Sequence, residues 1–179
     1  MKKPVITIFL NLFLFTVHSQ SIAELYKRVN PSVVTILTAS KVLKEDHEMA
    51  TDEGIGSGVI ISGDGEILTA AHVVNDAEKI TVRFFNGEEI PAKVIRSAPM
   101  ADLALIVLSW MPKKYTVAQL GDSDKVSVGE QIIIVGAPYG LEHSLSVGHI
   151  SGRKEQKTRT SGFTLNEFFQ TDASINQGN

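Results

Sequence analysis

The hydrophobic and polar residues of this chain follow three successive patterns. An apolar run from Val5 to Val17, broken only by Asn11 and two threonines, comes first, and Lys2 and Lys3 precede it. A membrane-spanning helix needs about 20 apolar residues, so a shorter run after two lysines is typical of a secretory signal peptide. We therefore predict a signal peptide over residues 1–19, with an uncleaved membrane anchor as the alternative.

The second pattern is amphipathic, and the third alternates between apolar and polar residues. Ile22–Val29 has the apolar spacing of a helix, which Asn30-Pro31 should end. Six short strands without a long helix between them indicate a small closed antiparallel barrel, since closure removes unpaired strand edges. The predicted strands are Val33–Leu37, Val59–Ser62, Glu66–Thr69, Lys79–Phe85, Glu88–Ser97 and Leu103–Leu108.

Turn residues and charged stretches separate the predicted strands. Asn86-Gly87 should join its two neighbouring strands as a two-residue hairpin loop in which both residues have positive φ. Lys41–Glu53 and Arg153–Ser161 are rich in charged residues, and we interpret both as solvated loops.

A second group of strands follows Met111-Pro112. We predict strands at Gln131–Gly136, Leu145–Gly152 and Phe168–Asp172. Three strands cannot close a barrel, so this region would present unpaired edges and an uncovered apolar face. The predicted fold class is all-β, with one complete barrel and one incomplete barrel.

Composition and charge exclude several classes of protein. The 179 residues are 43% hydrophobic and 21% charged, as in an ordinary globular protein, and the net charge of −3 does not favour nucleic acid. Without cysteine there is no disulfide, no thiolate nucleophile and no Cys-based zinc site. No two histidines have the i, i+4 spacing of a zinc helix, so we predict no metal and no cofactor, and we interpret His47, His143 and His149 as solvated.

Two residues of the first predicted barrel have the chemistry of a catalytic pair. His72 directly follows a predicted strand, and Asp102 stands at the start of an otherwise apolar one. A carboxylate that binds one imidazole nitrogen fixes the tautomer and stabilises the protonated ring. From the residues alone, His72 could equally be a satisfied core histidine, and Asp102 could point into solvent.

Three motifs, in order, resemble the high-temperature-requirement A (HtrA/Deg) serine proteases, which have a chymotrypsin-like double β-barrel. The motifs are Thr69–His72, Ala101–Leu105 and Gln170–Asn179, and the segments Gly56–Ile60, Leu120–Ser123 and Gly136–Leu141 also agree with the family pattern. This resemblance implies that His72 is the general base and that Asp102 orients it. It also implies that Gly178 and Asn179 begin the loop whose backbone N–H groups form the oxyanion hole.

The family pattern continues past Asn179 with the nucleophilic serine and two glycines, whereas this sequence ends at Asn179. We therefore expect a fragment or a truncated reading frame that lacks the nucleophile and is inactive as written. Neither Ser57 nor Ser174 occupies the position of the family's nucleophile. The resemblance implies a first barrel within residues 20–112, an incomplete second barrel over 113–179, and no PDZ domain.

The resemblance also implies a function and a location. The expected function is that of an exported, periplasmic endopeptidase that degrades unfolded or misfolded proteins, and the full-length protein should be a homotrimer. Membrane association would require that the signal stays uncleaved. Two alternatives remain open: a catalytically dead, polypeptide-binding or regulatory homologue, and an exported β protein in which His72 and Asp102 are incidental.

Overall fold

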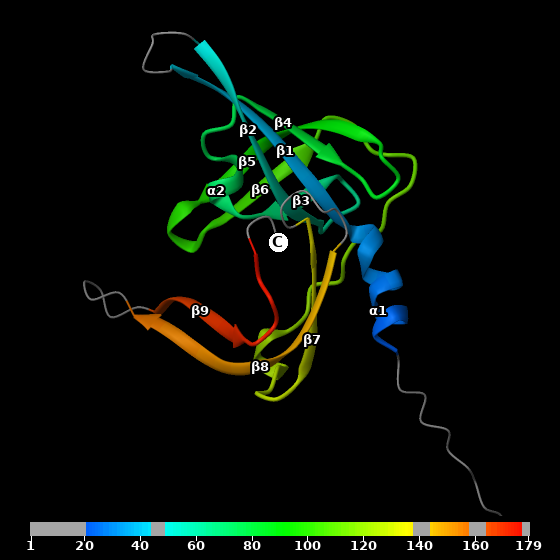
Figure 1. Ribbon diagram of the computed structural model, residues 1–179, viewed down its shortest axis with the longest axis vertical. Helices are drawn as coiled ribbons and strands as arrows, with labels where there is room; N and C mark the ends of the chain where they lie inside the picture. Colours follow the sequence, from blue (N-terminus) through cyan, green and yellow to red (C-terminus); the bar gives the residue numbers. More distant parts are fainter. Residues whose placement is uncertain (1–20, 44–48, 138–143, 158–163, 177–179) are drawn as a thin grey trace, which may run out of the picture.

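The computed structural model describes residues 21–43, 49–137, 144–157 and 164–176. The predicted signal peptide, His47, His143, Gly178 and Asn179 lie outside the described residues. The chain folds into a closed barrel and a smaller sheet beside it (Figure 1). In the described part of the chain, no helix is both long enough and apolar enough to span a membrane.

The first element is helix α1 (Ile22–Val29), as the amphipathic pattern predicts. Ser21 caps it: its hydroxyl accepts the N–H of Glu24, and the Glu24 carboxylate accepts the N–H of Ser21. This reciprocal pair satisfies two backbone donors that the first helical turn leaves unpaired. The helix passes into the short 3-10 turn η1 (Asn30–Ser32), which leads directly into the barrel.

Six antiparallel strands close the barrel in the order β1-β2-β3-β6-β5-β4, which confirms the predicted closed barrel. Every second residue of the short strands points inward, and Ile67, Val82 and Ile106 are completely buried. The strands are β1 (Val33–Leu43), β2 (Met49–Ile60), β3 (Glu66–Thr69), β4 (Lys79–Arg83), β5 (Glu89–Ala98) and β6 (Leu103–Leu108).

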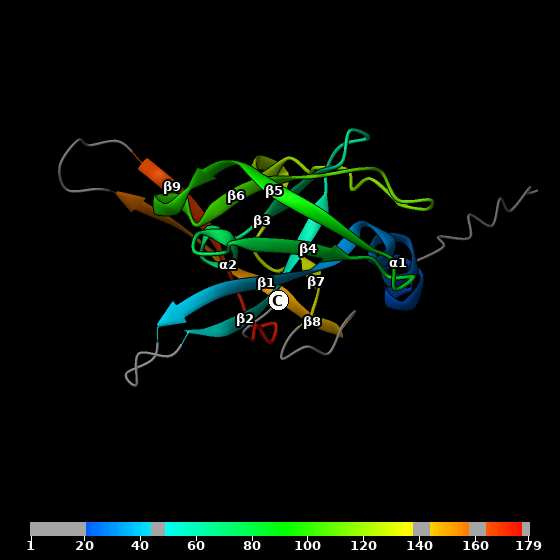
Figure 2. The same ribbon diagram turned by 90° about the horizontal axis from the view of Figure 1, so that it is seen from above.

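The predicted loop over Lys41–Glu53 is wrong for most of its length. β1 continues to Leu43 and β2 begins at Met49, and the two strands pair throughout. They form a two-stranded arm that projects from the barrel in both views (Figures 1 and 2). The arm has exposed side chains on both faces, so no buried stripe marks it in the sequence.

The hairpin between β4 and β5 is present, but its turn differs from the prediction. Gly87 has φ +81, whereas Asn86 does not have a positive φ. The Gly87 N–H donates to the carbonyl of Phe84, and the Phe84 N–H donates to the carbonyl of Glu88. These bonds enclose a three-residue loop with one left-handed glycine, the second common hairpin geometry.

The second sheet has the three predicted strands, in the order β7-β8-β9. They are β7 (Gln131–Gly136), β8 (Ser144–Lys157) and β9 (Thr164–Thr171). The predicted loop over Arg153–Ser161 is wrong at its start, because β8 continues to Lys157. Two hydrogen bonds tie the regions together: the Ala137 N–H donates to the Ser57 hydroxyl at 2.8 Å, and the Ala118 N–H donates to the carbonyl of Ile60 at 2.8 Å.

Candidate active site

The end of β3 and a single helical turn position His72. Helix α2 (Ala71–Val74) buries Ala71 and Val74, which leaves the intervening His72 on the outer face of the turn. The buried Thr69 hydroxyl donates to the carbonyl of Ser57 at 2.7 Å and so fixes the strand end from which the turn starts. The imidazole is therefore exposed while its backbone is anchored to the barrel core.

Close packing against β2 also holds this turn in place. A Cβ on Gly56 would lie 2.7 Å from both methyl groups of Val73, the residue that follows His72. Only glycine permits this approach, because real Cβ atoms do not come so near to another side chain. Gly56 and Val73 thus set the distance between the histidine turn and the barrel wall.

A second turn delivers Asp102 to the same place. The 3-10 turn η2 (Pro99–Ala101) ends at Asp102, which has φ +50 and whose N–H donates to the carbonyl of Pro99. Aspartate is one of the few non-glycine residues that adopt this left-handed conformation readily. β6 then buries alternate residues, so the carboxylate lies at the rim of the barrel and not inside it.

Both carboxylate oxygens of Asp102 bind His72. Oδ1 accepts the backbone N–H of His72 at 3.0 Å, and Oδ2 lies 2.7 Å from Nδ1 of the ring. An ionised carboxylate only accepts hydrogen bonds, so Nδ1 carries the proton and Nε2 keeps its lone pair. The structure thus brings together the two residues that the sequence left open between a paired and a solvated state.

The pair is accessible to solvent, and its electrostatics follow from the hydrogen bonds. The His72 backbone N–H is the largest cause that lowers the pKa of Asp102; partial burial opposes it, and the ring of His72 lowers the pKa further. The side chain of His72 is 71% exposed, and that of Asp102 is 53% exposed. Asp102 is therefore a stable anion that presents a correctly oriented imidazole to the outside.

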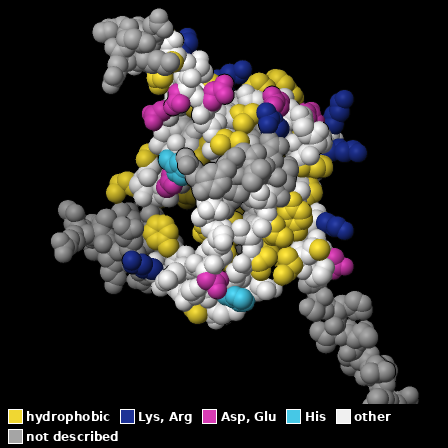
Figure 3. Space-filling model, in the orientation of Figure 1, with side chains coloured by type: hydrophobic (Ala, Val, Ile, Leu, Met, Phe, Trp, Pro, Cys, Tyr) yellow, Lys and Arg dark blue, Asp and Glu magenta, His cyan; other side chains and the backbone are white. Residues whose placement is uncertain are grey.

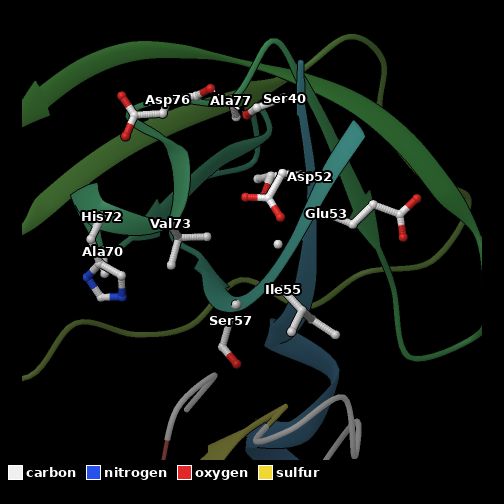
Figure 4. Close-up of a pocket in the computed structure, with 13 residues that line it drawn as sticks. Ser40, Asp52, Glu53, Ile55, Ser57, Ala70, His72, Val73, Asp76 and Ala77 are labelled. Atoms are coloured by element: carbon white, nitrogen blue, oxygen red, sulfur yellow. Dashed lines mark hydrogen bonds between the residues drawn. The ribbon is translucent and has the colours of Figure 1, made fainter. Parts of the chain in front are cut away.

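A pocket of about 410 Å³ opens beside His72 (Figure 4). Residues of β1, β2 and the α2 turn line it, so it belongs entirely to the first barrel. No group of three His, Cys, Asp or Glu side chains that could hold a metal ion occurs in the described ranges. The site as described combines an oriented base with an adjacent cavity.

The chain after β9 leaves the second sheet and turns back toward the barrel (Figure 1). Asp172 starts this segment, and its Oδ1 accepts the N–H of His149 on β8 at 2.6 Å. A Cβ on Gly148 would lie 2.6 Å from the Cα of Ala173, which is buried against β8. These contacts direct the segment that leads to Gly178 and Asn179.

Comparison with known proteins identifies the family. A family model described as a trypsin-like peptidase domain matches residues 56–179. The chain belongs to the trypsin-like peptidase family. Its relatives and structural neighbours are HtrA/Deg serine proteases, as the three sequence motifs predicted.

The similar proteins are longer than this peptidase chain. It is 38% identical to the periplasmic pH-dependent serine endoprotease DegQ of Escherichia coli (strain K12), over 89% of this chain and 38% of DegQ. It is 41% identical to a probable periplasmic serine endoprotease, DegP-like, of Pseudomonas putida (strain GB-1), over 71% of this chain and 26% of that protein. An HtrA-type protease, AlgW S227A with decapeptide, superimposes with a TM-score of 0.78 at 29% identity, covering 89% of this chain and 53% of AlgW.

Sequence reasoning missed several residues that shape this peptidase site. Gly56 and Gly148 were not recognised as close-approach positions, and Asp172 was not recognised as the anchor of the last segment. A glycine next to a motif is a weak signal by itself, because its partner lies far away in the chain. The side chain of His149, which we interpret as solvated, is 53% exposed, and its Nδ1 also lies 3.7 Å from Oδ2 of Asp172.

Proposed function

We propose that this chain provides the base, its orienting carboxylate and the approach to the oxyanion loop of a periplasmic HtrA-type serine endopeptidase. The 2.7 Å contact between Nδ1 of His72 and Oδ2 of Asp102 carries the proposal. Nε2, with its lone pair free, accepts the proton of a serine hydroxyl and later delivers it to the leaving amine. Asp102 keeps the ring in this tautomer and stabilises the imidazolium that forms.

The remaining parts of the mechanism come from the family pattern. Gly178 and Asn179 begin the loop whose N–H groups stabilise the tetrahedral oxyanion, and the family pattern has its nucleophilic serine directly after these two residues. No serine of the 179 residues matches that position, so we expect these residues alone to cleave no protein. Loss of the nucleophile in such a triad lowers turnover by about 10⁶-fold.

The substrates and assembly of the full-length protein follow the same proposal. Similar proteins are named periplasmic endoproteases, which supports export and an action on proteins of the cell envelope. Unfolded or misfolded polypeptides are the proposed substrates, since an endopeptidase site needs an extended chain. A homotrimer is the proposed assembly, and export depends on the predicted signal over residues 1–19.

The proposal is tested on the protein encoded by the complete reading frame. Wild type and His72→Ala are assayed on a fluorophore-labelled denatured protein, and Asn75→Ala, which alters the exposed end of the same turn, is the matched control. We expect the His72→Ala variant to lose at least about 10³-fold in kcat with an unchanged melting temperature, because the ring is exposed. The control variant should retain activity.

Two results would count against the proposal. Full activity of His72→Ala would remove the histidine from the mechanism. Absence of activity in the wild type, together with a stop codon directly after Asn179 and an abundant soluble product, would favour the catalytically dead, polypeptide-binding homologue.

A further inference from the structure

The pocket beside His72 follows one face of β2. Gly54 and Gly56 lie on the same face of β2, two residues apart, and both line the pocket. Thr38 and Ser40 of the neighbouring β1 stand opposite Gly54 and Asp52 in the strand register. Side chains cover both glycines: a Cβ on Gly54 would meet the Thr38 hydroxyl, and a Cβ on Gly56 would meet the methyl groups of Val73. Thr38 and Val73 therefore form the part of the lining that lies between the two-stranded arm and the histidine turn.

The lining of this pocket is acidic. Asp52, Glu53 and Asp76 belong to the lining, and none of the described lining residues is Lys or Arg. In Figure 4 the Asp52 carboxylate is directed toward the middle of the pocket, whereas Glu53 points away from it. Alternation along β2 explains the difference, because adjacent residues point to opposite faces of a strand.

Glu53 also belongs to a different environment. On its own side of β2 it lines a second hollow together with Lys79 and Arg83. Glu89 lines the same hollow and pairs with Arg83 at 2.8 Å, so Lys79 and Arg83 balance two carboxylates there, whereas the described lining of the first pocket contains no Lys or Arg. Asp52 is the anion that a guest side chain in the first pocket would meet.

The position of the pocket determines which part of a substrate reaches it. The lining includes His72 but neither Asp102 nor the η2 turn, so the pocket opens from a different side of the imidazole. The leaving amine takes its proton from His72, and the residues after the scissile bond must run out past this ring. The first barrel alone builds that exit, whereas the oxyanion loop of the proposed mechanism arrives from the second sheet.

We propose that this pocket is a subsite for a cationic side chain, Lys or Arg, in the leaving half of the substrate, and that Asp52 determines this preference. The inference rests on the proposed peptidase function. Asp52 lies four residues from Gly56 along β2, which corresponds to about 13 Å. A long side chain covers part of this distance, so the selected residue is the second or third after the scissile bond.

The test is a positional scan with internally quenched peptides, cleaved by the full-length protein. One cleavable sequence is varied between Lys, Ala and Glu at each position from the third residue before the scissile bond to the third after it. We expect kcat/KM to be about two- to fivefold higher for Lys than for Glu at the second or third position after the bond, as for an exposed charge pair. The preference should disappear near 1 M salt, where the screening length is about 3 Å.

Variants separate Asp52 from its neighbours. Asp52→Asn should abolish the preference, Asp52→Lys should invert it, and Asp52→Glu should retain it. Asp64→Asn, the matched control with the same change of charge in the exposed turn between β2 and β3, lies outside the pocket lining and should leave the preference intact. A merely structural role of Asp52 would change the cleavage of all peptides equally.

Four outcomes would overturn the inference. Equal kcat/KM for Lys and Glu at the positions after the scissile bond would do so while leaving the peptidase function in place. A preference that survives in Asp52→Asn, or that occurs only before the scissile bond, would exclude Asp52 in the same way. Failure of the wild type to cleave any peptide would overturn the proposed function itself, and the subsite with it.

Discussion

Asp102 serves both the chemistry and the backbone of the site. Its two carboxylate oxygens bind the ring and the backbone of His72, and its φ of +50 turns the chain from η2 into β6. Asparagine also tolerates the left-handed conformation, but its amide group does not carry the charge that stabilises an imidazolium. The two roles can therefore be separated by a single substitution.

We predict that Asp102→Asn in the full-length protein lowers kcat by about 10⁴-fold, as in related triads, with little change in melting temperature. The measurement is steady-state cleavage of a quenched peptide together with a thermal unfolding scan. Asp122→Asn is the control, because it removes a carboxylate of similar exposure, 51%, far from His72 in the chain. Equal losses in both variants would contradict a specific role for Asp102.

The pH dependence of stability follows from two aspartates. Backbone N–H donors, from His72 and from His149 respectively, lower the pKa of Asp102 and of Asp172 in the folded protein. A lowered folded-state pKa gives stability that is complete above the unfolded-state value, near 4, and is lost as the pH falls through the folded-state value. In urea, the free energy of unfolding of the wild type should therefore exceed that of Asp172→Asn at pH 7, and this difference should become smaller below about pH 4. A difference of constant size across this range would contradict the assignment.

Local sequence patterns singled out His72 and Asp102 but left their contact open, and only the family resemblance implied it. His72 and Asp102 are thirty positions apart, and only the pairing of β3 with β6 brings their turns together. The left-handed φ of Asp102 has no signature in the sequence, since aspartate is common in ordinary turns as well. The family resemblance supplied what local patterns could not.

At the scale of elements, two glycines set the distances between neighbouring segments. Gly56 makes room for the side chain of Val73, whereas Gly148 makes room for the backbone of Ala173. A side chain can be shortened by a second mutation, but a backbone cannot. The two positions should therefore respond differently to the same substitution.

We predict that Gly56→Ala destabilises the barrel by about 1–3 kcal/mol, because the added methyl group displaces the turn that carries His72. Val73→Ala in the same chain should recover part of this loss, since it removes both methyl groups that collide. Urea denaturation of the two single variants and the double variant measures the coupling. Additive losses would show that the two side chains do not share this contact.

No second substitution of a side chain should compensate for Gly148→Ala in this way. A Cβ there meets the Cα of Ala173, so the segment after Asp172 must shift away from β8. We predict a lower kcat with a nearly unchanged KM, because the displaced segment leads to the proposed oxyanion loop. Gly152→Ala is the control on the same strand, since its added Cβ would make only an ordinary contact at 3.4 Å with Gln170. Equal kinetics of both variants would refute this role of Gly148.

Elements with a buried face were predictable, and elements without one were not. β3, β6 and β7 have the predicted bounds, because their apolar residues are confined to the strands themselves. The outer parts of β1 and β2 consist mostly of exposed residues, polar and apolar, and pairing with each other is what makes them strands. From the pattern of charges alone, such an arm is therefore predicted to be a loop.

At the scale of the molecule, the two β regions differ in how much they bury. The barrel has a continuous core of thirteen buried hydrophobic residues. Among the described residues of the second region, the buried hydrophobic side chains are Ala137, Ile150 and Ala173. Phe168 and Phe169 of β9 remain substantially exposed. Local stability should therefore fall from the barrel to the outer strands of the second sheet.

Amide hydrogen exchange of the 179-residue chain, followed by mass spectrometry, tests this gradient. We expect the slowest exchange in β3, β4 and β6 and much faster exchange in β9, because opening the second sheet exposes little apolar surface. Peptides from β7 should lie between these extremes, since the Ala137 N–H is held by Ser57 of the barrel. Uniform protection across both regions would contradict the expected difference.

The arm formed by β1 and β2 forms one boundary of the pocket. Its far ends carry the exposed side chains of Leu43 and Met49, each 63% accessible, and a two-stranded ribbon has little rigidity of its own. Asp52 sits on this ribbon, whereas His72 is anchored to the barrel. At the level of Asp52 the arm is joined to the segment that follows the histidine turn, because the Ser40 hydroxyl, opposite Asp52 in the register, donates to the carbonyl of Asp76 at 2.5 Å. A partner that bound the exposed tip of the arm would therefore act on the proposed subsite through this contact.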